Sequence, residues 1–215
     1  QARLTVIDGL RRAYSANDWE TCIRLGEEHA DDDEIAYILA CSHFSLAWKK
    51  IGEYEVADAL CELDTAETSG GRTVYCEEIF ARAIDYTRLL AKNLATDDIP
   101  EGLCDARGCG EHLPPDIPAY FVALKCLRSG EDSALNFPHT SHRAEHLAAA
   151  ELSVEEEYTE AIRRLRRLAD NRELPAYMRY HVLSDLEVAA DLSGNARLAY
   201  NTAKQKLDLI KKCKV

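Results

Sequence analysis

The chain has 215 residues, 47% of them hydrophobic and 30% charged, and a formal net charge of −12. This length suffices for one large domain or one continuous superhelix with a sizeable core. The acidic balance disfavours a nucleic-acid backbone as the main partner, and no apolar run approaches the roughly 20 residues of a membrane-spanning helix. Residues 1–150 carry 14 Lys and Arg against 27 Asp and Glu, whereas residues 151–215 carry 12 against 11. This pattern is typical of a solvated acidic surface, and it could also orient the chain toward a partner.

Apolar residues recur with helical periodicity along most of the chain, and the alternation typical of strands is scarce. Gly and Pro cluster between the periodic segments, where they end helices. The sequence therefore predicts an all-α protein with a single domain over residues 1–215. The expected helices cover residues 2–15, 18–30, 34–50, 53–66, 72–95, 118–130, 141–151, 153–171, 175–193 and 195–213.

The first expected helix has more apolar side chains than one narrow stripe would hold: Leu4, Val6, Ile7, Leu10 and Tyr14. One set can pack on the second helix, and the remainder needs another cover. An isologous homodimer would supply that cover. These five residues are therefore candidates for a dimer interface.

A set of large and small residues with fixed spacing follows, at Phe44, Trp48, Gly52, Tyr54 and Ala57. Gly52 would permit a turn conformation that a side chain resists. Ala57 would let two antiparallel helices approach closely, while Trp48 and Tyr54 fill the wedge between them. We therefore expect Ala57→Trp to destabilise the chain by more than about 2 kcal/mol through overpacking.

The same scheme recurs before and after this segment. About 35 residues earlier, the period of a tetratricopeptide repeat, Asn17 and Trp19 take the positions of Gly52 and Tyr54. In the C-terminal part the matching residues are Tyr158, Ala161, Gly194 and Ala199. The chain thus resembles the tetratricopeptide-repeat (TPR) family, which implies antiparallel helix pairs stacked in a right-handed superhelix.

Residues 96–117 are too rich in Gly, Pro and Asp for a helix and predict an irregular insertion. Cys104, Cys109 and His112 lie in it, and Cys126 follows. Thiolates and an imidazole suit tetrahedral zinc, but the pair of cysteines separated by two residues that marks such sites is missing. The preferred interpretation is an insertion with exposed or half-buried thiols and no metal.

The letters HRAEH match a pattern of inverted zinc metalloproteases. On a helix His142 and His146 would share a face as two zinc ligands, and Glu145 could act as a base. Those enzymes also need a distant third ligand in a much larger fold. With His139 added, the three histidines could bind a metal adventitiously, although plain surface histidines are the simpler interpretation. We expect a repeat helix capped by Ser141 here, with no catalysis, no metal and no cofactor.

The densest basic cluster runs from Arg163 to Arg167. It lies on an expected helix beside glutamates, so intrahelical ion pairs explain it well. A patch that binds an acidic peptide is the alternative.

Eight cysteines are present: Cys22, Cys41, Cys61, Cys76, Cys104, Cys109, Cys126 and Cys213. Several occupy helix positions that suit a small apolar residue, and no Asn-x-Ser/Thr acceptor for glycosylation appears. Free buried thiols in a reducing compartment, the cytoplasm or nucleus, fit better than a disulfide framework.

Within the TPR proteins, four segments are similar to the N-terminal domain of the eighth-subunit family of the anaphase-promoting complex. They are RRAYSANDWETCIRLGEE, ILACSHFSLAWKKIGEYEVADALCELD, AYFVALKCLRSGED and RELPAYMRYHVLSDLEVAADLSGNARLAY. The second segment has extra residues before its turn. The resemblance implies the N-terminal part of a longer scaffold protein in a cell-cycle ubiquitin ligase, without an active site, that pairs as a homodimer through its N-terminal repeats.

Other function classes stay open at this point. In one, the chain is an adaptor whose concave groove binds a short peptide of a chaperone or targeting partner. The Lys and Asn set with which some TPR domains clamp chaperone tails cannot be placed here, which puts the chaperone role in doubt. In another, the histidine or cysteine cluster serves an enzyme. The expected partners are proteins, as a homodimer and in a larger complex, and neither nucleic acid nor a membrane.

Overall fold

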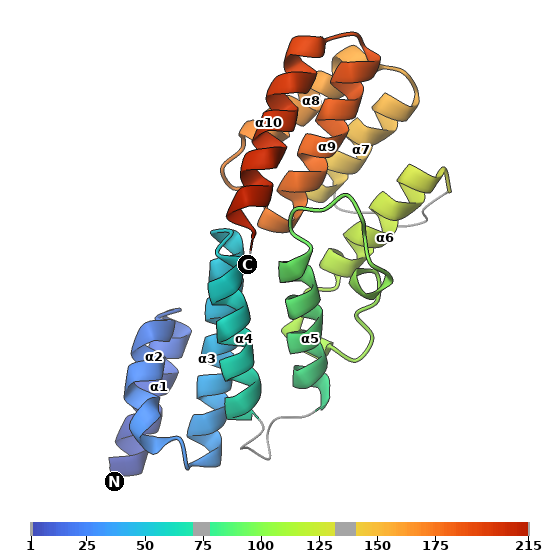
Figure 1. Ribbon diagram of the computed structural model, residues 1–215. Helices are drawn as coiled ribbons and strands as arrows, with labels where there is room; N and C mark the ends of the chain where they lie inside the picture. Colours follow the sequence, from blue (N-terminus) through green and yellow to red (C-terminus); the bar gives the residue numbers. More distant parts are fainter. Residues whose placement is uncertain (1, 71–77, 132–140, 215) are drawn as a thin grey trace. The chain divides into compact units, whose positions relative to one another are not determined.

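The computed structural model describes residues 2–70, 78–131 and 141–214. These residues form ten α-helices and no strand, which confirms the all-α class (Figure 1). The helices are α1 (Ala2–Ser15), α2 (Trp19–Gly26), α3 (Asp33–Gly52), α4 (Val56–Gly70), α5 (Glu78–Lys92), α6 (Asp116–Ser129), α7 (His142–Val154), α8 (Tyr158–Asp170), α9 (Ala176–Leu192) and α10 (Ala196–Lys212). A search of the described helices for one long and apolar enough to cross a membrane finds none.

The chain groups into two compact units. The first comprises Gln1–Ala91 and Arg107–Leu113, with helices α1 to α5, and the second comprises Lys92–Ala106 and Pro114–Lys214, with helices α6 to α10. Each unit has its own buried side chains. A single domain over residues 1–215 stays a prediction.

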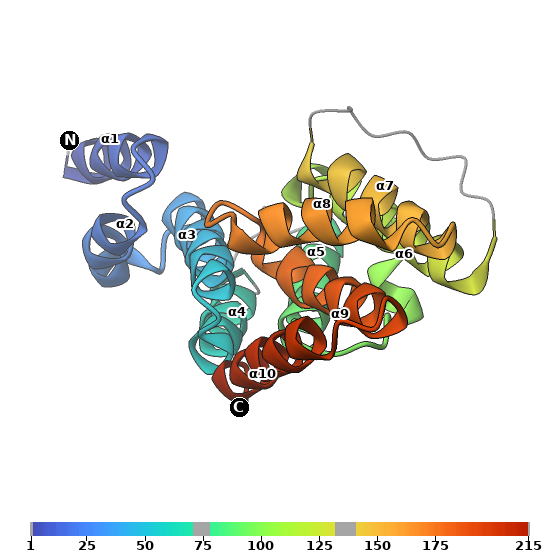
Figure 2. The same ribbon diagram turned by 90° about the horizontal axis from the view of Figure 1, so that it is seen from above.

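Helices pair as hairpins in both units. The pairs are α1 with α2, α3 with α4, α7 with α8 and α9 with α10, and the two members of each pair lie side by side in both views (Figures 1 and 2). One turn recurs between the members of every pair. A residue with positive φ ends the first helix, and the next residue donates its backbone N–H to the carbonyl five positions earlier, at 2.8–3.0 Å. This is the Schellman arrangement, which satisfies carbonyls left over at a helix end.

The positive-φ residues of the four turns are Asn17, Tyr54, Glu156 and Gly194. Five residues after each of them, the second helix of the pair carries a small side chain. Those side chains are Cys22, Ala59 and Ala161, which are fully buried, and Ala199, which is half-buried. A small residue at this position lets the two helices approach closely. The recurrence of turn and small residue together gives the chain a structural repeat.

This register corrects two assignments made from the sequence. Gly52 lies inside the last turn of α3 and has no positive φ; Tyr54 adopts that conformation instead. The turn therefore begins two residues later than the sequence pattern suggested. As a result Ala57 is exposed, and the buried alanine in the helix contact is Ala59.

The remaining residues assigned to repeat packing are aromatic. Phe44 is buried, and its ring lies 5.4 Å from that of Phe80 on α5. Trp19, Trp48 and Tyr158 are half-buried. All four lie on hairpin helices, and Phe44 also packs against α5.

The first helix packs within its own unit. Ile7 and Leu10 are buried, 2% and 0% exposed, and partly buried Val6 packs against them. They share a core with Ala13, Cys22, Ile35 and Leu39. Ile7 and Leu10 are thus removed from the candidate dimer interface, because α2 and α3 already cover them. Leu4 and Tyr14 are the exposed members of the proposed set, at 62% and 37%.

The irregular insertion expected at residues 96–117 is confirmed. Between α5 and α6 the described chain holds only two 3₁₀ turns, Glu101–Leu103 and Gly110–His112. Lys92–Ala106 belongs to the second unit, where it reaches α9 through Asp97. The insertion therefore contributes a largely solvent-exposed carboxylate that is bonded to α9 of the second unit.

Candidate functional site

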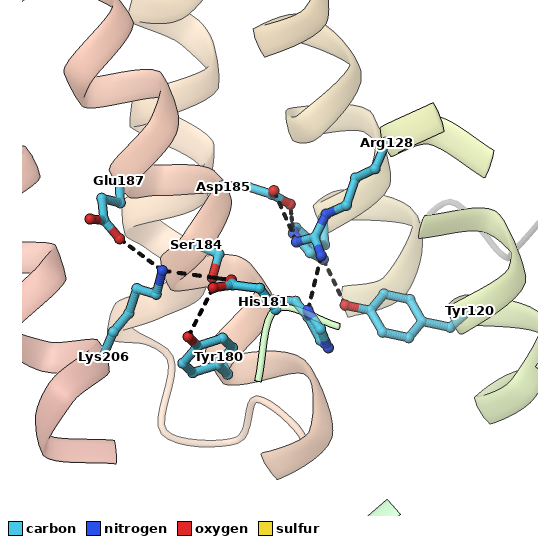
Figure 3. A network of polar contacts seen from close by, with 10 residues as sticks. Tyr120, Arg128, Tyr180, His181, Ser184, Asp185, Glu187 and Lys206 are labelled. Atoms are coloured by element: carbon cyan, nitrogen blue, oxygen red, sulfur yellow. Dashed lines mark hydrogen bonds and ion pairs between the residues drawn. The ribbon is translucent and has the colours of Figure 1, made fainter. Parts of the chain in front are cut away.

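A network of polar side chains occupies the interior of the second unit (Figure 3). At its centre is His146 on α7, which is fully buried. Its Nδ1 lies 2.9 Å from the Tyr120 hydroxyl on α6, and its Nε2 lies 2.8 Å from Asp185 on α9. Both contacts are satisfied when Nε2 donates to the carboxylate and Nδ1 accepts from the hydroxyl. The imidazole thus joins three helices.

Arg128, near the end of α6, extends the network from the other side. Its guanidinium donates to Asp185 at 3.0 Å and to Nδ1 of His181 at 3.2 Å. Burial raises the pKa of Asp185, but the hydrogen bond from His146 and the charge of Arg128 lower it by more, so this pKa lies below its usual value. The pKa of His181 falls to about 3, because burial disfavours the imidazolium and Arg128 repels it.

A second cluster surrounds Asp97, from the insertion. Its carboxylate accepts hydrogen bonds from the Ser184 hydroxyl at 2.7 Å and from the Tyr180 hydroxyl at 3.2 Å. The Lys206 ammonium lies 3.7 Å from Asp97 and 2.8 Å from Glu187 (Figure 3). Burial raises the pKa of Asp97, whereas Ser184 and Lys206 lower it by more, so the carboxylate has a pKa below its usual value.

A pocket of about 510 Å³ opens beside this network. Its polar lining is Asp97, Arg128, Ser153, Glu156, Ser184 and Asp185, and its apolar or aromatic lining is Leu127, Ala150, Val154, Tyr158, Val188 and Leu192. Val154, Val188 and Leu192 are 65%, 53% and 59% exposed, which makes them three of the large apolar side chains most open to water in the described chain. Polar groups beside exposed aliphatic side chains are a lining typical of binding pockets. The polar residues are called the floor below, and Val154, Val188 and Leu192 the aliphatic wall.

The network itself does not present a reactive group to this pocket. His146 and Tyr120 are fully buried, and burial raises the pKa of the Tyr120 phenol well above its usual value. The network groups that do line the pocket, such as Arg128, Ser184 and Asp97, are bonded to one another or to neighbouring side chains. The arrangement holds α6, α7, α9 and the insertion together and shapes the pocket floor.

The HRAEH histidines do not converge. His142 lies 3.0 Å from the side-chain nitrogen of Asn171, and Glu145 pairs with Arg167. His146 is a buried residue of the network, which corrects the interpretation of this histidine as surface. Ser141 caps α7 by accepting from the Ala144 N–H at 3.2 Å, as predicted. His139 lies outside the described residues.

The cysteines of the predicted set differ in burial. Cys109 is buried, and Cys104 and Cys126 are half-buried. The His112 ring packs 5.0 Å from the ring of Phe80. Among the residues that the structure describes, no three His, Cys, Asp or Glu side chains gather as a metal site would require.

The arginine cluster of α8 is paired, as the sequence indicates. Arg163 and Arg164 both contact Glu160 on the same helix, at 2.6 Å and 2.7 Å. Arg167 reaches Glu145 on α7. Arg163, Arg166 and Arg167 line a hollow together with Asp170 and Asn171.

The network was not predictable from the sequence pattern, because its members come from distant segments: Asp97, Tyr120, Arg128, His146, His181 and Asp185. One signal was available. In α9, most of whose residues are buried, His181, Ser184 and Asp185 stand at helical spacing and form one polar stripe. A polar stripe on a buried helix requires partners.

Comparison of the chain with protein-family models, with curated proteins and with solved structures gives no match.

Proposed function

We propose that this chain is a non-catalytic protein-interaction module made of TPR-like helical hairpins. The observation that carries the proposal is the repeated turn, in which a positive-φ residue precedes a small helix-contact residue by five positions. Hairpins of this kind bury their apolar faces mainly against the next helix along the chain, so that long helix surfaces stay available for other proteins.

The pocket beside the polar network supports the same conclusion. Exposed aliphatic side chains gathered at one site mark protein contacts more often than plain surface. The pocket favours the adaptor form of the function, in which a segment of a partner protein binds. No catalytic step is proposed, because the buried histidine and tyrosine of the network cannot reach a bound molecule.

The scaffold form remains a second candidate. It comprises a right-handed superhelix, homodimerisation through the first repeats and a place in an anaphase-promoting ubiquitin ligase, all of which the family resemblance implies. Leu4 and Tyr14 on α1 supply exposed apolar surface for a dimer. If this form is correct, light scattering should give twice the 24.1 kDa chain mass, and Leu4→Glu should give a folded monomer.

Capture of partners from extract of the protein's own cells, with three immobilised versions of the chain, tests the proposal. The versions are wild type, Val188→Asp in the pocket and Leu207→Asp on α10. The two substituted positions have similar exposure, 53% and 49%, but only Val188 lines the pocket. We expect the same proteins with wild type and Leu207→Asp, and their loss with Val188→Asp. No specific protein on wild type, or equal capture by all three, would contradict the proposal.

A further inference from the structure

We propose that the pocket between α6, α7 and α9 takes a lysine or arginine side chain of the partner protein. This inference rests on the proposed function and specifies the chemistry of the docking segment. Two features of the pocket carry it, an aliphatic wall and an excess of carboxylates.

The wall matches the stem of a long basic side chain. Val154 at the end of α7 and Val188 and Leu192 on α9 stand more than half exposed around the pocket. Lysine and arginine bury their methylene stems along apolar surface while the charged group stays near water or a counter-ion. Such a stem would cover these three side chains.

The charges at the pocket favour a cation. Three carboxylates, those of Asp97, Glu156 and Asp185, line it against one guanidinium, that of Arg128. Arg128 is already bonded to Asp185 at 3.0 Å, so these two charges offset each other. The carboxylates of Asp97 and Glu156 remain. The Asp97 side chain is 65% exposed, and its nearest cation, Lys206, lies closer to Glu187 than to Asp97.

Other occupants fit these charges less well. An acidic segment would meet Asp97 and Glu156 as like charges. A purely apolar segment would cover the same carboxylates without offering them a partner, and desolvating an ionised group in this way is costly. A basic side chain satisfies both the wall and the carboxylates.

Titration of the isotope-labelled chain with capped synthetic peptides, followed by NMR, tests the inference. The peptides have about nine residues of Gly, Ser, Ala and Leu and differ only at the centre, which is lysine, norleucine or glutamate. Norleucine keeps the four-carbon stem and lacks the ammonium group. We expect the lysine peptide to shift the methyl signals of Val154, Val188 and Leu192, and to bind roughly fivefold more tightly than the norleucine peptide, with glutamate weakest. Added salt should reduce the advantage of lysine.

Two variants and one control test which carboxylates bind the lysine ammonium group. Asp97→Asn and Glu156→Gln should each bring the affinity for the lysine peptide toward that for the norleucine peptide. Glu156 has no side-chain partner in the described chain, so its substitution tests the charge even if Asp97→Asn disturbs the fold. Asp208→Asn on α10 is the control, because it removes an equal charge from an exposed site outside the pocket. Its affinity should not change.

Equal affinities for the lysine and norleucine peptides would contradict the inference, because they would show that the pocket binds the apolar stem and not the charge. Preference for glutamate, or no shift at the three methyl groups with any peptide, would overturn the inference. If partners are nevertheless lost with Val188→Asp in the capture experiment, the proposed function stands and only the assignment of the docking side chain fails.

Discussion

His146 and Asp185 form the contact that ties α7 to α9, with the imidazole Nε2 2.8 Å from the carboxylate. The same carboxylate accepts from Arg128 at the end of α6. Asp185 is therefore the residue through which three helices of the second unit share one polar interaction. Its side chain is only 16% exposed, so water cannot easily replace these partners.

Asp185→Ala should lower the free energy of unfolding by about 3 kcal/mol, since it leaves a cation and a buried imidazole without their shared acceptor. Urea denaturation measures the change. Asp191→Ala, on the same helix at an exposed position, is the matched control and should stay within about 0.5 kcal/mol of wild type. Equal effects of the two substitutions would show that the buried contact contributes nothing specific.

Stability should depend on pH through His181. Its pKa is about 3 in the folded chain, against an ordinary value of 6.5, so the unfolded state binds the proton first. The free energy of unfolding is therefore highest above pH 6.5, where His181 is neutral in both states, and it declines as the pH falls toward 3. Between pH 7 and pH 5 the free energy of unfolding should decrease by about 2 kcal/mol from this residue alone. Denaturant titrations of wild type and His181→Asn at several pH values measure it. An equal decrease in the variant would assign the effect to other groups.

The corrected register predicts opposite outcomes for two alanines of α4. Ala59→Trp should destabilise the chain by about 2 kcal/mol or more, because Ala59 is fully buried in the helix contact. Ala57→Trp should change stability by less than about 0.5 kcal/mol, because Ala57 is exposed. Thermal melts of both variants decide between the registers. A large loss for Ala57→Trp together with a small loss for Ala59→Trp would restore the register read from the sequence.

Two glycines make a similar pair. Gly194 has φ +77°, and a Cβ there would meet no atom within 4 Å. Gly194→Ala should therefore lower the free energy of unfolding by about 1 kcal/mol, through backbone strain alone. Gly52 has no positive φ and equally open surroundings, so Gly52→Ala should leave stability unchanged or raise it by up to about 1 kcal/mol. Chemical denaturation of both variants checks the difference, and a loss at Gly52 matching that at Gly194 would go against the turn assignment.

Helical periodicity was enough to predict the all-α class, the approximate bounds of the helices and the irregular insertion. Those features depend on local spacing and on Gly and Pro, which the sequence displays directly. The register of the repeat was not predictable in the same way. At the end of α3, Gly52 suggested the turn, but the chain continues helically and Tyr54 takes the positive φ. Glycine permits that conformation without requiring it.

The site was less accessible from the sequence. His146 attracted notice as part of a protease-like motif, whereas its actual partners are Tyr120, which lies 26 residues earlier, and Asp185, which lies 39 residues later. Asp97 comes from the insertion and gave no signal of its own. Contacts between distant segments depend on how the helices pack, and the local pattern of a single sequence does not predict that packing.

The central claim, that the pocket beside Val188 contacts a partner protein, is tested most directly by photo-crosslinking. A benzophenone amino acid is placed at Val188 in one version of the chain and at Leu207 in another, and both are irradiated in the protein's own cells. We predict a discrete adduct of the chain with a protein at Val188 and none at Leu207, with a lysine or arginine close to the crosslinked residue of the partner. No adduct at Val188, or the same adducts at both positions, would contradict the account.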